Sequence, residues 1–211
     1  MKALPMTPLF GKIIFFLLLI VGYCGCKQKA KPDYEAWKSK LETVYDNDQK
    51  YRDRIEEITM TEGPGTDEYN DIWDKQTRLD SANLEIVKEM ISQHGGFPGI
   101  SVLGEQASST IFLVLQHAPD QVQAEYIDLI LEAARKGEIN KKEAARYHDR
   151  YLMNQDLPQI YGSQVITTRI LDSLTGEEID SIFLWPMRDT TNIDSIRKFN
   201  GMEPLQRYLQ F

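Results

Sequence analysis

The first residues that could carry chemistry are Asp48 and Arg52, a charged pair on an otherwise apolar helix face. In steps of three and four residues from Tyr34 to Ile58, seven of eight positions are aromatic or aliphatic, and the eighth is Asp48. A charge on an inward face is costly unless it is paired, and Arg52 follows four residues later on the same face. Asp48 and Arg52 therefore predict a structural ion pair or, with Gln49, a ligand-binding pocket between helices. A rotated helix would instead leave the pair in solvent.

The next predicted helix has the same construction. Its inward face is apolar at both ends, but its middle carries Gln76, Asp80 and Asn83. The Gly-Pro-Gly sequence at 63–65 would turn the chain and pack the two helices antiparallel, with Asp48 and Asp80 at similar distances from the turn. The polar middles of the two helices are therefore expected to meet. The residues expected to converge there are Asp48, Arg52, Asp80 and Asn83.

Among the three histidines, His117 is the candidate for catalysis. It follows an apolar run within a Gln-His-Ala sequence, at the expected end of a helix. A histidine that only caps the helix is the simpler interpretation, since a helix C-terminus favours positive charge. The alternative is a general base, because imidazole exchanges protons near neutral pH. In that case Asp149 or Asp48 would orient His117, and Arg52 or Arg150 would hold an anion.

A second polar stretch lies before the predicted hairpin. Residues 159–164 are dense in hydrogen-bonding groups at the point where a strand begins, which is a common place for the rim of a pocket. The further candidate ligand-binding residues are Gln116, Arg150, Tyr161, Ser163 and Gln164. No nucleophile elbow, P-loop, dinucleotide-binding glycine pattern or paired-histidine metal motif occurs. The sequence therefore predicts neither a cofactor nor a metal site.

Taken together, these residues resemble the signature of an uncharacterised bacterial family. Its members share a Gln-His-Ala motif, an Asp-Arg pair and a Tyr-Gly-Thr-Gln motif, which correspond here to residues 116–118, 149–150 and 161–164. The similarity extends over roughly residues 40–210 and includes the segments around Asp48, Asp80 and Gly96. This chain has Phe97 where tryptophan is commoner and Ser163 where threonine is commoner, and the serine keeps the hydroxyl. The resemblance supports the choice of site residues and implies no activity.

The elements that must position these residues form a mainly α domain of about five to seven helices with a small C-terminal β-hairpin. The apolar periodicity and the turn residues predict helices at 33–59, 66–93, 104–117, 119–137, from Asn140 onward, near 193–199 and near 204–209. The hairpin is expected from alternating residues at 165–170, a turn at 174–176 and an apolar run at 182–185.

The N-terminal segment predicts a secreted precursor. An uninterrupted apolar run at 13–21 follows Lys2 and Lys12 and precedes small residues, which is the pattern of a signal peptide. The run is about half of the roughly 20 residues that a membrane-spanning helix needs. A buried core helix is the alternative, but such a helix should carry a polar stripe, and this run has none.

The end of this segment resembles the processing site of a bacterial lipoprotein. Gly25 precedes Cys26 and a polar, lysine-rich stretch follows, so Cys26 is the expected lipidated residue. Cys24 is the alternative, and Tyr23 departs from the usual aliphatic residue. The expected organisation is a signal peptide at 1–25, a lipidated cysteine and tether at 26–32, and one domain at 33–211. The chain is therefore expected in the bacterial cell envelope, with the outer membrane favoured.

Charge and cysteine content narrow the classes of partner. Removal of Lys2 and Lys12 with the signal peptide would change the net charge from −8 to −10, and no cysteine follows Cys26. An acidic domain is not suited to nucleic acid, whose phosphates require clustered lysine and arginine. The expected partners are the membrane, through the lipid, and a small polar ligand or a peptide. A binding lipoprotein is favoured slightly over a hydrolase that acts on an envelope component.

Overall fold

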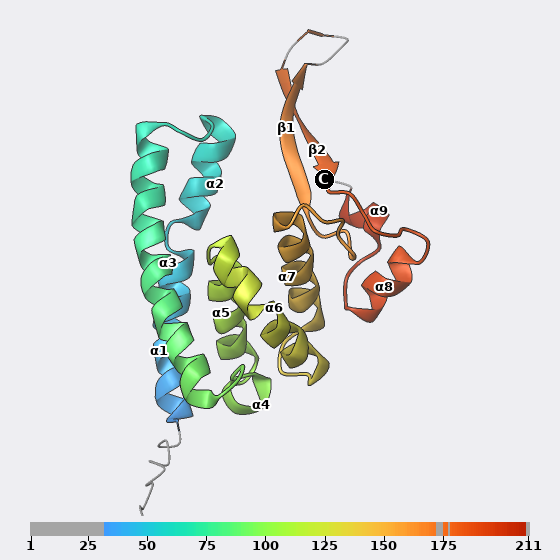
Figure 1. Ribbon diagram of the computed structural model, residues 1–211. Coiled ribbons are helices and arrows are strands. Elements are labelled where there is room, and N and C mark those ends of the chain that lie inside the picture. The colour runs from blue at the N-terminus through green and yellow to red at the C-terminus, as the bar shows by residue number, and fades with distance from the viewer. Residues whose placement is uncertain (1–31, 172–174, 177, 210–211) are drawn as a thin grey trace, which may run out of the picture. The chain divides into compact units, whose positions relative to one another are not determined.

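The computed structural model describes residues 32–171, 175–176 and 178–209. The predicted signal peptide, Cys26 and the tether as far as residue 31 lie outside the described residues. Helices dominate, and the strands pair as one antiparallel hairpin near the C-terminus (Figure 1). This confirms the predicted fold class. The helices are α1 Tyr34–Gln49, α2 Arg52–Thr61, α3 Asp67–His94, α4 Ile100–Leu103, α5 Glu105–Gln116, α6 Asp120–Arg135, α7 Lys141–Asn154, α8 Ile193–Phe199 and α9 Leu205–Tyr208, and the strands are β1 Val165–Leu171 and β2 Glu178–Leu184.

The first predicted helix is divided in two. The break falls between α1 and α2, where Tyr51 leaves the helical conformation with φ −118° and ψ 0°. The backbone N–H of Tyr51 donates to Oε1 of Gln76 on α3, 3.1 Å away. The Gln76 amide in turn donates to the carbonyl oxygens of Asn47 and Asp48 at 3.2 and 2.9 Å. One side chain of α3 therefore satisfies backbone groups on both sides of the break, which apolar periodicity could not predict.

Helix α3 is the long element against which α1 and α2 pack (Figure 1). Its N-terminus is capped by Thr66, whose hydroxyl accepts a hydrogen bond from the N–H of Tyr69 at 3.1 Å. It ends at Gly95, which has φ +83°, a left-handed conformation that glycine adopts at little cost. The predicted boundaries of this helix, 66–93, agree closely with these caps.

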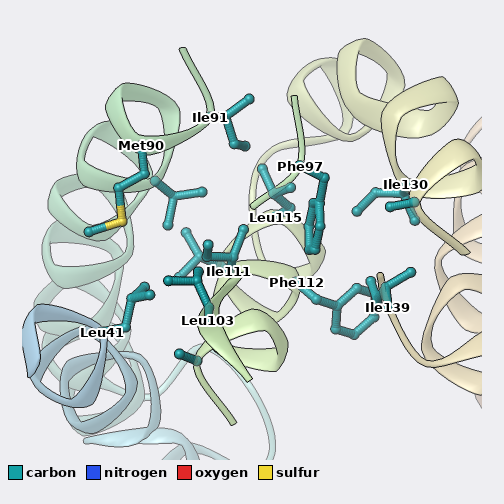
Figure 2. Packing of buried hydrophobic residues seen from close by; sticks show 14 of the residues in the cluster. Leu41, Met90, Ile91, Phe97, Leu103, Ile111, Phe112, Leu115, Ile130 and Ile139 are labelled. Atoms are coloured by element: carbon teal, nitrogen blue, oxygen red, sulfur yellow. The ribbon is translucent and has the colours of Figure 1, made fainter. Parts of the chain in front are cut away.

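The hydrophobic core lies between α1, α3, α5 and α6. Side chains from these elements point toward one another, and α5 contributes buried residues on most of its faces (Figure 2). Each fully buried aliphatic side chain contributes roughly 1.5–3 kcal/mol to folding. The packing therefore fixes the C-terminal end of α5, which carries His117, against the C-terminal end of α1. The labelled core residues include Leu41, Met90, Ile91, Ile111, Leu115 and Ile130.

The C-terminal part of the chain follows the α6–α7 pair. A loop at 155–164 leads from α7 into β1, and β1 pairs with β2 in the register Val165↔Leu184. Several apolar side chains on this hairpin are exposed, among them Ile166 and Phe183, which face each other across the strands. In the described part of the chain, no helix has the length and apolar character that crossing a bilayer requires.

Candidate functional site

Asp48, in the last turn of α1, lies at the centre of the candidate site. Its side chain is only 1% exposed, and its carboxylate accepts hydrogen bonds from three side chains. These are Nδ1 of His117 at 2.9 and 3.0 Å, Nη2 and Nε of Arg52 at 3.3 and 3.4 Å, and Nε2 of Gln49 at 2.6 Å. Burial by itself raises the pKa of Asp48, but the hydrogen bonds and charges of His117 and Arg52 outweigh it and leave this pKa below its ordinary value. Asp48 is therefore a carboxylate at neutral pH.

This carboxylate determines how His117 presents its ring. His117 is the residue that ends α5, and its backbone N–H donates to the carbonyl of Leu113 at 3.0 Å. An ionised carboxylate can only accept, so Nδ1 of His117 carries the hydrogen that points to Asp48. In the neutral ring, Nε2 is then the atom with a free lone pair. The side chain of His117 is 25% exposed and lines a cavity, so the ring is accessible to a ligand.

A second layer of contacts fixes Arg52. Its Nη2 donates to Oδ1 of Asp80 on α3 at 2.9 Å, and Nε2 of Gln76 donates to the same oxygen at 2.7 Å. The structure therefore brings together the predicted residues Asp48, Arg52 and Asp80, while Asn83 lies beside them and donates to the carbonyl of Val44 at 3.1 Å. Gln76, buried to 1% exposure, belongs to this network although it was not among the predicted site residues. The sequence does carry a signal for Gln76, because it is a polar residue in the middle of a helix face that is apolar at both ends.

The cavity beside His117 has a volume of about 720 Å³. Residues from α2, α3, α5, α6 and α7 line it, among them Arg52, Trp73, Asp80, Gln116, His117 and Arg150. Four described residues have a buried side-chain nitrogen or oxygen atom without a hydrogen-bond partner, and three of these residues line this cavity: Gln116, Gln123 and Arg150. Buried polar atoms in proteins are nearly always hydrogen-bonded to protein or to ordered water, so these three residues have atoms left for a partner within the cavity.

The described residues offer no set of metal ligands. Within 32–171, 175–176 and 178–209, no group of three histidine, cysteine, aspartate or glutamate side chains is arranged to hold a metal ion.

Of the other predicted site residues, Asp149 lies on α7, and Tyr161, Ser163 and Gln164 lie in the loop that follows it. Asp149 on α7 is fully buried, and its carboxylate accepts hydrogen bonds from the backbone N–H groups of Ile160, Tyr161 and Ser163 at 2.8–3.2 Å. The hydroxyl of Ser163 also donates to it at 2.8 Å, which gives a reason for a hydroxyl at this position. Asp149 therefore anchors the loop before β1 and makes no described hydrogen bond to His117. The orienting carboxylate of His117 is Asp48, the other residue considered for that role.

The same loop is held from its other side by Arg197 on α8. The guanidinium is 1% exposed and donates to the carbonyl oxygens of Tyr161 at 2.7 Å and Gly162 at 3.0 Å. Gly162 has φ +67°, and a Cβ atom there would come within 2.9 Å of Cδ1 of Leu205. The Gln164 amide contributes a 3.3 Å hydrogen bond to Oγ of Ser163. The Tyr-Gly-Ser-Gln segment thus has a structural role in the described contacts, and none of its residues lines the cavity beside His117.

Comparison with known proteins adds one finding to this geometry. No curated protein matches the chain, and no solved structure does. A family model described as a family of unknown function, DUF6624, matches residues 35–211, which include α1 to α9 almost entirely and all the contacts described above. The chain therefore belongs to DUF6624, a family of unknown function.

Proposed function

We propose that this protein is an enzyme, a hydrolase that acts on a component of the bacterial cell envelope, with His117 as its general base. The observation that supports this proposal is the contact between Nδ1 of His117 and the buried carboxylate of Asp48 at 2.9 Å, in a ring that lines a cavity. A histidine that only capped its helix would need neither the carboxylate nor the access. A general base needs access to the substrate, and a carboxylate on the other ring nitrogen fixes the tautomer and the orientation of the base.

In the proposed reaction, Nε2 of His117 accepts a proton from a water molecule in the cavity as the water oxygen attacks the carbonyl carbon or phosphorus atom of the substrate, whose bond to the leaving group then breaks. The resulting imidazolium is stabilised by Asp48 and by the C-terminal end of α5. It then returns the proton to the leaving group, which restores the neutral ring. Water is the proposed nucleophile because the nearby Ser81 hydroxyl donates to the carbonyl of Thr77, at 2.8 Å, and no described hydrogen bond joins it to His117.

The alternative is a binding lipoprotein that holds a small polar ligand or a peptide without changing it. The unpartnered polar atoms of Gln116, Gln123 and Arg150 would suit a bound ligand equally well. The two functions differ in what they require of His117. A binding protein could dispense with its proton-accepting nitrogen, whereas the proposed enzyme could not.

A hydrolysis screen separates the two functions. The purified protein would be incubated with aryl esters, aryl phosphate esters and peptidoglycan fragments, in parallel with the His117→Gln variant. We expect turnover of at least one class by the wild type only. Equal turnover by both proteins would reject His117 as the base. Binding of a screened compound without turnover, unchanged in His117→Gln, would favour the binding protein.

We also propose that Cys26 attaches the protein to the cell-envelope membrane through a lipid. The support is the Gly25-Cys26 sequence that follows the predicted signal segment. The Cys26→Ser protein is expected to lose fatty-acid labelling and to leave the membrane fraction, while Cys24→Ser serves as the matched control and keeps both. Labelling of cells with a clickable fatty acid measures this. Lipid labelling that persists in Cys26→Ser and disappears in Cys24→Ser would move the anchor to Cys24.

A further inference from the structure

Three of the arginines that the structure describes, Arg52, Arg150 and Arg197, are at least partly buried and differ in what they bind. Arg52 contacts the carboxylates of Asp48 and Asp80. Arg197 donates to carbonyl oxygens and lies 4.9 Å from the centre of the Tyr208 ring. Arg150 has neither kind of partner: among the described residues, no salt bridge or hydrogen bond to its guanidinium occurs, and its Nε is buried without an acceptor.

The position of Arg150 in the fold suggests why its guanidinium has no partner. Arg150 lies on α7 one residue after Asp149, but its side chain lines the cavity beside His117, with Gln116 and Gln123. A partly buried guanidinium without an anion is unfavourable, because protein does not replace the water that it loses. Consistent with this, burial lowers the pKa of Arg150, and the charge of Asp120 only partly offsets the effect.

We propose that Arg150 is the subsite for an oxyanion of the substrate, either a carboxylate or a phosphate. The planar guanidinium carries five N–H donors in a fork that fits the two oxygens of such a group. The unpartnered Oε1 atoms of Gln116 and Gln123 line the same cavity and would accept hydrogen bonds from hydroxyl or N–H groups elsewhere on the substrate, since Nε2 of Gln123 already donates to the carbonyl oxygens of Gln116 and Ala118. The subsite rests on the proposed function in one respect, which is that both use the same cavity. Binding of an oxyanion at Arg150 does not require proton transfer at His117.

The acidic residues that line the cavity are compatible with an anion at Arg150. Asp80 accepts a hydrogen bond from Nη2 of Arg52 at 2.9 Å, in an ion pair that Arg52 shares with Asp48. Glu85 is exposed and lies 3.7 Å from Nζ of Lys88. Asp120 is exposed and accepts a hydrogen bond from Asn154, and water screens an exposed charge more effectively than a buried one. Among the charged side chains that line this cavity, Arg150 is thus the one that is partly withdrawn from water and makes no ion pair with a described residue.

Calorimetric titration of the full-length protein tests the subsite with three probes of similar size: phenyl phosphate, benzoate and the uncharged benzyl alcohol. Salt concentration is held constant. We expect one of the anions to bind at least about tenfold more tightly than benzyl alcohol, the scale of a charge-assisted hydrogen bond. The tighter of the two anions identifies phosphate or carboxylate as the group. Absence of any preference for an anion would overturn the subsite.

Variants assign the preference to Arg150. Arg150→Met should remove it, and Arg150→Lys should retain part of it, since lysine keeps the charge but loses the fork. The matched control is Arg146→Met, the same change one turn earlier on α7 at an exposed residue outside this cavity. The subsite would be overturned if the preference for an anion is undiminished in both Arg150→Met and Arg150→Lys. It would also be overturned if Arg146→Met removes the preference to the same extent. His117→Gln should keep the preference, so a failure of catalysis and a failure of the subsite are distinguishable.

Discussion

Replacement of His117 by glutamine is expected to lower the turnover number about 100- to 10,000-fold, the usual contribution of a positioned general base. Glutamine has nearly the size of histidine and can still donate a hydrogen bond to Asp48, but it has no nitrogen that accepts a proton near neutral pH. The Michaelis constant should change little, because Arg150 and the amides that line the cavity remain. A loss confined to the turnover number indicates a group that acts in the transition state.

The control for this variant is His94→Gln, the same substitution at the end of α3. His94 accepts or donates a hydrogen bond with the Tyr34 hydroxyl at 2.9 Å and does not line the cavity of His117. Its replacement should leave turnover within about twofold, because residues without shared partners rarely couple by more than about 0.5 kcal/mol, and the contact with Tyr34 lies outside this cavity. Full activity of His117→Gln would exclude the proposed base.

Much of the fold could be predicted from the sequence because its signals are local. The Thr66 cap, the glycine after α3 and the apolar run of α5 each determine a boundary through neighbouring residues. The break between α1 and α2 could not be predicted, since it depends on Gln76, a side chain 25 residues from Tyr51 along the chain. Tertiary contacts of this kind override the periodicity of a single segment.

The candidate site could likewise be predicted in part from the sequence. Spacing alone indicated that Asp48, Arg52 and Asp80 would lie close together, because the two predicted helices share a turn, and the break at Tyr51 does not separate Asp48 from Arg52. Spacing could not choose between Asp48 and Asp149 as the partner of His117, since that choice depends on how α5 packs against α1 and how the loop after α7 folds back. Nor could it show that Arg52 is paired while Arg150 is not. Both distinctions arise from packing between segments far apart in the sequence.

Removal of the Asp48 carboxylate is expected to produce the largest loss of stability in the site. Asp48→Ala leaves Nδ1 of His117 without its acceptor beside a buried void, and breaking a buried charge pair costs about 3–5 kcal/mol. We expect the lower end of this range, because Arg52 keeps its contact with Asp80. The urea midpoint should therefore fall by about 1–3 M. Asp46→Ala, an exposed change on the same helix, should leave the midpoint nearly unchanged.

A double-mutant cycle with Arg52→Met measures how much of the Asp48 effect belongs to the ion pair, with coupling of about 0.5–3 kcal/mol expected for residues in contact. Acid provides an independent check. The pKa of Asp48 is lowered in the folded protein, so its stabilisation is fully present above its ordinary value of 3.8 and is lost as the pH falls through the lower, folded value. The difference in unfolding free energy between wild type and Asp48→Asn should therefore be constant near neutral pH and shrink below about pH 4. A difference that stays constant down to pH 2, or a wild-type urea midpoint in Asp48→Ala, would mean that the carboxylate stabilises neither Arg52 nor His117, and the orientation proposed for the base would lose its physical cause.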